Sequence, residues 1–257
     1  MTVILKAEGL SKYFGGLIAV NKVNFHISQN ETVGIIGPNG SGKTTFFNLV
    51  SGLFPPTEGR IIFFGNDITD TPPNQRVLKG MARTFQLVSV FNSMSVWENL
   101  VLSGIRFQKE HTSHWKFLLS PANNEAIRRN CLEAMQLVGL ESKSLTLTSE
   151  LSYGYKRMLE IAIALSLNPK LLLLDEPLSG LSDLEITEVL DILQRIKKNL
   201  TLVIIEHKLS KIVNLVDRLC VMNEGSFICE GMPDQVLSNT AVRECYWGKG
   251  EIDQWSS

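Results

Sequence analysis

The sequence lacks any apolar run long enough to cross a membrane, although 44% of its 257 residues are hydrophobic. A membrane-spanning helix needs about 20 consecutive apolar residues. The stretch from Leu159 to Leu174 comes nearest, but Glu160 and the polar run at 168–170 interrupt it. The first residues also lack the basic and apolar segments of a secretory leader. We therefore expect a cytoplasmic protein whose contact with a membrane, if it has one, is peripheral.

An excess of charge of one sign is also lacking, because 25 Lys and Arg residues nearly balance 26 Asp and Glu residues. A net charge of -1 creates no field that attracts a polyanion, so nucleic acid is not predicted as a partner.

Closely paired cysteines are missing as well. The scattered positions of Cys131, Cys220, Cys229 and Cys245 argue against zinc and dithiol redox sites and favour buried free thiols.

What the sequence does contain is the alternation of strand and helix patterns that is typical of an α/β protein. Val23, Phe25 and Ile27 alternate with polar residues and predict a half-buried strand. Further strands are predicted at 33–36, 60–64, 171–175 and 201–205, with a turn at 65–67. The all-apolar strands among them indicate a sheet that is covered on both faces.

Helical patterns separate these strands. Helices are predicted at 44–50, 155–167 and 184–197, and short helices at 233–247 after a hairpin over 221–230. From Ser95 to Leu140 the pattern is mostly helical, with an irregular middle at 109–120 and an amphipathic stretch at 126–138. This region is expected to form an inserted helical lobe.

A glycine-rich segment between a predicted strand and a predicted helix carries the strongest chemical signal. It reads Gly37, Pro38, Asn39, Gly40, Ser41, Gly42, Lys43, Thr44, and we include Thr45 among its nucleotide-binding residues. Glycines let backbone N–H groups converge on an anion, and the helix N-terminus adds positive potential. Lys43 is predicted to reach the terminal phosphates, and the Thr44 hydroxyl to bind Mg²⁺. A chance glycine-rich turn is the alternative.

Two carboxylates follow the apolar strand at 171–175, at the edge of the sheet where ligands of open α/β proteins bind. Asp175 is predicted to hold Mg²⁺, and Glu176 to polarise the water that attacks the γ-phosphate. A buried strand that merely ends in acids is the structural alternative, and the phosphate-binding loop upstream makes it less favoured.

The segment Leu151–Arg157, with the sequence LSYGYKR, separates the possible classes of nucleotide enzyme, and here the chain resembles the ABC ATPase family. We call it the signature segment. In that family it lies over the γ-phosphate of a second subunit. A hydroxyl on Ser152, the small Gly154 and a helix N-terminus suit a second anion-binding surface. Taken alone, Ser152 would be interpreted as an ordinary N-cap.

The resemblance extends over nearly the whole chain and implies further roles. Tyr13 is similar to the aromatic residue that stacks on adenine, although it could belong to the core. Gln86 resembles the loop glutamine that senses Mg²⁺ and joins the helical lobe, and His207 the switch histidine that touches the γ-phosphate. Residues 179–183 resemble the loop that contacts the partner subunit. The resemblance therefore implies Glu176, His207 and Gln86 as catalytic residues, with ATP and Mg²⁺ as cofactors.

Two residues of the signature segment differ from the usual family pattern. Tyr153 and Tyr155 stand where Gly and Gln are usual. Tyr153 resembles the residue at this position in the branched-chain amino-acid and urea importer subfamily. The same subfamily is indicated by the segments at 83–86 and 205–207, by Trp115 and by the ending that includes Gly248. An exporter or lipid-extraction ATPase, or a nucleotide-gated binding module with little turnover, is the alternative.

The expected architecture is that of an α/β P-loop NTPase with a mostly parallel sheet, an N-terminal antiparallel β subdomain and an inserted α-helical lobe. We predict one domain, with residues 1–86 and 151–257 as nucleotide-binding core and 87–150 as the lobe. The resemblance implies transmembrane permease subunits, a second ATPase subunit in a homodimer or heterodimer, and an extracytoplasmic solute-binding protein as partners. It also implies a position on the inner face of the cell membrane.

Overall fold

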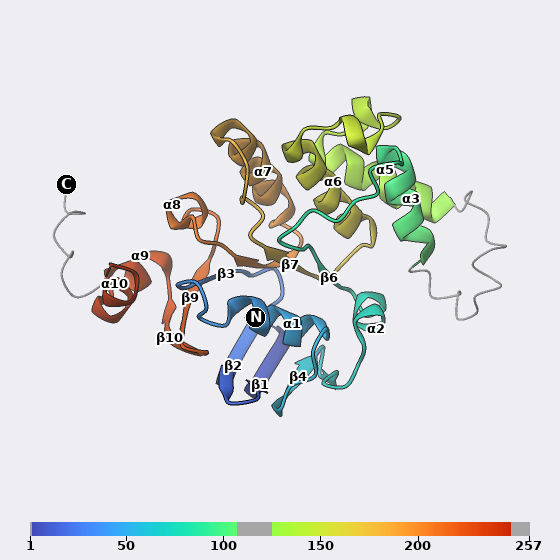
Figure 1. The fold of residues 1–257 in the computed structure, drawn as a ribbon. Helices are drawn as coiled ribbons and strands as arrows, with labels where there is room; N and C mark the ends of the chain where they lie inside the picture. Colours follow the sequence, from blue (N-terminus) through green and yellow to red (C-terminus); the bar gives the residue numbers. More distant parts are fainter. Residues whose placement is uncertain (1, 107–124, 248–257) are drawn as a thin grey trace. The chain divides into compact units, whose positions relative to one another are not determined.

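The computed structural model describes residues 2–106 and 125–247, and these form two compact units (Figure 1). The first unit comprises residues 2–71 and 201–247, and the second comprises 72–106 and 125–200. Lys109 to Ser120 with Trp115, and also Gly248, lie outside the described residues.

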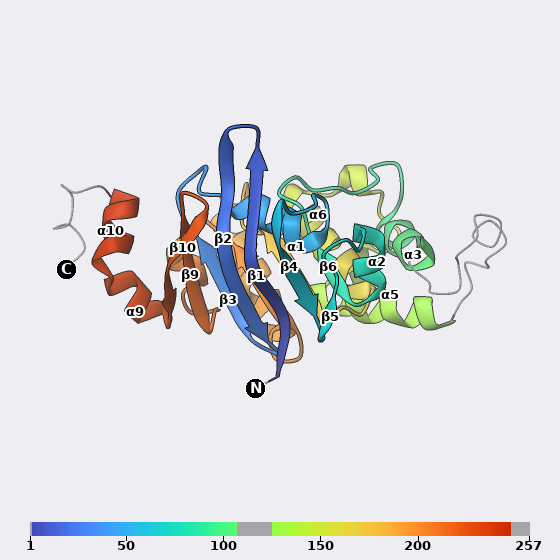
Figure 2. The same ribbon diagram turned by 90° about the horizontal axis from the view of Figure 1, so that it is seen from below.

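The first unit begins with an antiparallel sheet. Its strands are β1 (Val3–Phe14), β2 (Leu17–Ser28), β4 (Glu58–Phe63) and β5 (Asn66–Asp67), in the order β2-β1-β4-β5. Figure 2 shows β1 and β2 side by side along their length. Val23, Phe25 and Ile27 are buried, while the residues between them are exposed, as the alternation predicted. This sheet confirms the N-terminal antiparallel β subdomain.

The second sheet of the first unit is mostly parallel. Its strands are β3 (Thr32–Ile36), β8 (Thr201–Ile205), β9 (Arg218–Asn223) and β10 (Ser226–Gly231). β3 lies between β8 and β9 and is parallel to both, whereas β10 pairs antiparallel with β9. All residues of β3 and β8 are buried, in agreement with a sheet that is covered on both faces.

Helix α1 (Lys43–Ser51) links the two sheets of the first unit through aromatic side chains. Phe46 of α1 contacts Phe25 of β2 and Phe227 of β10, with ring centroids 5.3 and 5.6 Å apart. Short helices α8 (Leu209–Ile212), α9 (Pro233–Ser238) and α10 (Thr240–Trp247) complete the unit. The last two lie beyond β9 and β10 in both views (Figures 1 and 2).

The second unit combines a short parallel strand pair with a helical bundle. Strand β6 (Met81–Arg83) pairs with β7 (Leu171–Asp175). Helices α3 (Val96–Arg106), α5 (Glu125–Val138) and α6 (Tyr153–Ser166) pack against one another. The unit also contains α2 (Pro73–Leu78), α7 (Asp183–Ile196) and the 3-10 turns η1 (Glu141–Lys143) and η2 (Thr148–Glu150). The predicted helical insertion is thus confirmed over its described part.

Two expectations are corrected by the structure. Residues Asn66 and Asp67 form strand β5 instead of a turn, because Asp67 and Asn66 pair with Ile62 and Phe63 and the chain reverses earlier, at Phe64 and Gly65. Cys229 and Cys245 are half-buried rather than buried, because each lies on a short element near the rim of the first unit. No helix within residues 2–106 and 125–247 is both long and apolar enough to cross a membrane.

The burial of the thiols predicts their reactivity. Burial raises the pKa of the Cys131 thiol to about 11 and that of Cys220 to about 12, so neither forms the reactive thiolate near pH 8. We expect native protein to be labelled by a maleimide at Cys229 and Cys245 only, and unfolded protein at all four positions. Mass spectrometry of labelled peptides measures this, and rapid native labelling of Cys131 would contradict the packing of α5.

Candidate functional site

The phosphate-binding loop lies in the first unit, between the end of β3 and the start of α1, as predicted. Gly37 has φ 154° and Gly42 has φ 105°. A Cβ atom on Gly37 would lie 2.0 Å from the carbonyl oxygen of Met222, and one on Gly42 would lie 2.4 Å from that of Ala19. Both positions therefore require glycine for close approach of the backbone. Pro38, Asn39 and Gly40 remain accessible at the tip of the loop.

Lys43 folds back over its own loop. Its Nζ donates hydrogen bonds to the carbonyl oxygens of Gly37, at 2.8 Å, and Pro38, at 2.9 Å, and lies 3.5 Å from the Ser41 hydroxyl. The side chain is buried, while Thr44 is exposed and Thr45 half-buried at the first turn of α1. The loop thus places an ammonium group and a helix N-terminus around one space, an arrangement that suits a phosphate group.

Two further predicted residues lie in the first unit. Tyr13 is half-buried on β1, and its backbone N–H donates to the Thr57 hydroxyl at 3.1 Å. His207 follows β8 and has an exposed side chain. The buried carboxylate of Glu206 accepts hydrogen bonds from the backbone N–H groups of His207, at 3.0 Å, and Lys208, at 3.3 Å. Glu206 therefore fixes the backbone that carries His207.

The acidic pair lies in the second unit at the end of β7. Asp175 is buried, and its Oδ2 accepts a hydrogen bond from Arg83 Nη2 at 2.8 Å. Glu176 is half-buried and has φ 49°, in the left-handed region. Its Oε2 accepts a hydrogen bond from Gln86 Nε2 at 3.0 Å. The structure thus brings the side chains of Gln86 and Glu176 into contact.

A buried guanidinium holds the backbone that carries Gln86. Arg157 of α6 has no exposed surface, and it donates to the carbonyl oxygens of Phe85 and Gln86, both at 2.8 Å. It also donates to Glu160 Oε2 at 2.6 Å, while Glu160 Oε1 accepts from the Phe85 N–H at 3.1 Å. Burial is the largest influence on Glu160 and raises the pKa of its carboxyl, against the opposing hydrogen bonds and the Arg157 charge.

The signature segment opens α6, with Ser152 as N-cap and its hydroxyl accepting from the Tyr155 N–H at 3.3 Å. Ser152 is exposed and Gly154 is buried. Both donate hydrogen bonds to Glu185 Oε1 of α7, the Ser152 hydroxyl at 3.3 Å and the Gly154 N–H at 3.1 Å. The N-cap interpretation of Ser152 is therefore correct as local structure, and the same residue faces an anionic group.

The two tyrosines that differ from the usual pattern each have a partner in the second unit. The Tyr153 hydroxyl accepts a hydrogen bond from Arg157 at 3.4 Å, and its ring lies so close to Gly180 that a Cβ there would be 3.0 Å from it. The ammonium of Lys143 lies 4.5 Å from the centre of the Tyr155 ring, a cation–π contact. Tyr153 thus connects the signature segment to the loop at 179–183.

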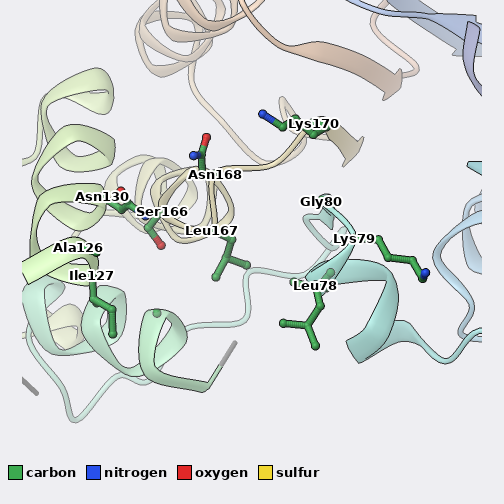
Figure 3. A pocket seen from close by; sticks show the side chains of 12 residues that line it. Leu78, Lys79, Gly80, Ala126, Ile127, Asn130, Ser166, Leu167, Asn168 and Lys170 are labelled. Carbon is green, nitrogen blue, oxygen red and sulfur yellow. The ribbon is translucent and has the colours of Figure 1, made fainter. Parts of the chain in front are cut away.

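A cavity of about 430 Å³ lies elsewhere in the second unit, at the C-terminal end of α6 (Figure 3). Leu78 of α2, Ile127 of α5 and Leu167 line it, and Lys79 points away. None of the predicted site residues lines this cavity.

The donor chemistry of the predicted metal ligands fits Mg²⁺, which prefers oxygen ligands. Thr44 offers a hydroxyl, Asp175 a carboxylate and Gln86 an amide oxygen, since the amide nitrogen of Gln86 is the atom that contacts Glu176. The Asp175 Oδ2 atom is paired with Arg83 Nη2 at 2.8 Å in this structure.

A phosphate-binding loop after a buried strand, with an acidic pair at the end of another parallel strand, defines a P-loop nucleotide-binding protein. Comparison with known proteins specifies the family. Residues 20–179 match the family described as ABC transporter. The chain is 36% identical over 255 residues to the high-affinity branched-chain amino acid transport ATP-binding protein BraF of Pseudomonas aeruginosa, covering 96% of this chain and 98% of that protein.

The corresponding protein LivG of Escherichia coli K12 is 36% identical over 253 residues, with the same coverage of both chains. Among solved structures, the ADP conformation of an ATP-binding cassette of an ABC transporter superposes with a TM-score of 0.85 at 32% identity, covering 97% of this chain and 100% of that one. The chain therefore belongs to the ABC transporter family and has the fold of its ATP-binding cassettes. The predicted family, fold class and ATPase class are confirmed.

Several residues around the site were missed by the sequence interpretation. From the sequence, Arg83 and Glu206 have no role beyond their place in a motif, and Glu160 has none beyond interrupting an apolar run. A charged pair at i, i+3 within an otherwise apolar helix, as in Arg157 and Glu160, is a signal that could have identified a buried ion pair. The Ser-x-x-Glu pattern of Ser182 and Glu185 could have identified a capping box.

The buried position of Arg157 predicts a large loss of stability on truncation. Arg157→Ala leaves Glu160 and two backbone carbonyls without their donor, and breaking a buried pair costs about 3–5 kcal/mol. We expect the free energy of unfolding, measured by urea denaturation, to fall by that amount. The control is Arg129→Ala, an exposed member of a 4.0 Å pair, for which we expect a change within about 0.5 kcal/mol. Equal stability of both variants would contradict the contacts described.

Proposed function

We propose that this chain is the ATP-hydrolysing subunit of an ABC transporter, and that it energises transport by a separate membrane protein. One observation carries the proposal. The chain has two elements that suit an anion, the phosphate-binding loop of the first unit and the N-terminus of α6 in the second, and each contains hydroxyl and backbone N–H groups at the start of a helix. A protein that bound its nucleotide through one copy alone would need only the first.

The second element is explained by a dimer. ATP binds between the phosphate-binding loop of one subunit and the signature segment of another, which is either a second copy or a related ATPase. Ser152 and Gly154 then contact the γ-phosphate from across the interface. Binding closes the pair, hydrolysis reopens it, and the membrane subunits follow these changes.

Each site residue has a role that its position supports. Lys43 contacts the β- and γ-phosphates through its ammonium group, the loop at 37–45 donates backbone N–H groups to the phosphates, and Tyr13 stacks on adenine. Thr44, Asp175 and Gln86 would hold Mg²⁺, which when bound offsets negative charge on the phosphates. Glu176 accepts a proton from the attacking water or orients it, and His207 contacts the γ-phosphate.

The relatives guide the assignment of cargo and partners. BraF and LivG are described as branched-chain amino acid transport proteins, so we propose import of branched-chain or hydrophobic amino acids, or of a related small solute such as urea. The partners are permease subunits in the membrane and an extracytoplasmic solute-binding protein. The chain is held on the inner face of the membrane by the permease, and its residues 1–257 act as one ATPase domain with a lobe at 87–150.

The two anion-binding elements should respond differently to substitution. Lys43→Ala removes the ammonium that contacts the phosphates and should abolish ATP binding. Ser152→Arg places a large cationic side chain on the signature segment. It should leave ATP binding to the isolated chain intact while phosphate release stops. Fluorescent-nucleotide binding and a phosphate-release assay measure the two effects. Equal loss of binding in both variants would show that one copy forms the whole site.

Neutralising Glu176 should separate binding from turnover. Glu176→Gln keeps the shape and hydrogen-bonding capacity of the side chain, so ATP and Mg²⁺ still assemble the dimer. Loss of the carboxylate should slow hydrolysis by roughly 10²–10⁴-fold, the effect of a positioned base. Size-exclusion chromatography with ATP should show a trapped dimer, and single-turnover hydrolysis gives the rate. Hydrolysis at the wild-type rate would remove Glu176 from the mechanism.

A further inference from the structure

The carboxylate of Glu185 occupies the donors of the signature segment. Its Oε1 accepts the Gly154 N–H at 3.1 Å and the Ser152 hydroxyl at 3.3 Å. Its Oε2 accepts the Ser182 N–H at 3.0 Å and the Ser182 hydroxyl at 2.8 Å. One carboxylate therefore bridges the N-termini of two helices, α6 and α7, and both of its oxygens are engaged.

The fit of Glu185 against α6 is close. A Cβ atom on Gly154 would lie 2.4 Å from Glu185 Oε1 and 2.6 Å from its carboxyl carbon. Only glycine at position 154 leaves room for the carboxylate beside the helix terminus. The positive potential of two helix N-termini favours the charged form of the carboxyl. Hydrogen bonds, led by those from Ser182, hold the pKa of Glu185 below its usual range, so the group is anionic at neutral pH.

The Gly154 N–H and the Ser152 hydroxyl cannot donate hydrogen bonds to two anions at once. A backbone N–H and a hydroxyl each carry one proton, so a proton given to Glu185 is not available to a phosphate oxygen. Two anions at the same helix terminus also repel each other. An ATP γ-phosphate that is presented by a partner subunit must therefore displace Glu185 Oε1 before it can reach Gly154 and Ser152.

From this geometry we infer that Glu185 is an internal ligand of the signature segment, which competes with ATP bound to the partner subunit and raises the ATP concentration needed for dimer formation. The inference rests on the proposed function, because it takes the signature segment as the surface that meets ATP. When Glu185 leaves Gly154, its Oε2 still caps α7 through Ser182, so displacement costs only half of its hydrogen bonds. Glu185 thus sets the ATP concentration that dimer formation requires, and it takes no part in the hydrolysis of ATP.

The test uses Glu185→Gln in the full-length Glu176→Gln chain. Glutamine also serves as the N3 residue of a capping box, so α7 keeps its cap while the competing charge is lost. Hydrogen bonds to a charged acceptor are about twice as strong as those to a neutral one. We expect the ATP concentration for half-maximal dimer formation, measured by sedimentation velocity with Mg²⁺, to fall roughly three- to tenfold.

The matched control is Glu188→Gln, which removes an equal charge from an exposed position one turn further along α7. We expect it to leave the ATP requirement unchanged. If Glu185→Gln needs as much ATP as this control, or more, then Glu185 does not compete and the inference is wrong, while the proposed function stands. If the Glu176→Gln parent stays monomeric at every ATP concentration, the proposed ATP-bridged pair of copies fails, and the inference falls with it.

A second measurement examines the contact itself in the absence of ATP. Amide hydrogen exchange of the peptide that contains Gly154 should be faster in Glu185→Gln than in the wild type or Glu188→Gln, because the Gly154 N–H then has only a neutral acceptor. Unchanged exchange would overturn the inference, whatever the dimerisation result. Unfolding midpoints of the variants verify that α7 remains capped.

Discussion

The contacts of the second unit depend on one buried guanidinium. Arg157 lies one turn into α6, yet it holds two carbonyl oxygens of the segment that carries Gln86. Buried backbone carbonyls need donors, and a charged donor without a carboxylate partner would be costly, so Glu160 accompanies it. Through this pair, the end of the signature segment and the segment that carries Gln86 belong to one set of hydrogen bonds.

This arrangement gives the unusual Tyr153 a physical explanation. A glycine in its place would leave the guanidinium without the hydroxyl contact and the loop at Gly180 without an aromatic neighbour. The tyrosine therefore lies between two segments that the proposed dimer would use together. Tyr155 has a partner of its own, because the ammonium of Lys143 lies over the face of its ring. Both tyrosines that differ from the usual family pattern thus have contacts within the second unit.

Most of the fold and the main motifs could be predicted because their signals are local. The phosphate-binding loop, the acidic pair and the cap at Ser152 each lie within a few residues of a strand end or helix start. The contacts that organise them are not local. Arg157 and its carbonyl partners are 71 and 72 residues apart, and Gly154 and Glu185 are 31 apart. The pattern of side chains within a short stretch of sequence contains no information about pairs that are so far apart along the chain. The sequence therefore predicted the motifs, but not the side-chain contacts that hold them in position.

The backbone of Glu176 has a consequence for how this protein could change. Its φ of 49° places a non-glycine residue in the left-handed region, which costs roughly 1–2 kcal/mol. Glycine would relieve that strain and asparagine would reduce it, yet either would remove the carboxylate. Selection for thermal stability alone therefore favours loss of the acid at this position, whereas under the proposed role of Glu176 in hydrolysis selection for turnover retains it. The end of β7 is thus a point where stability and activity impose opposite demands on a single residue.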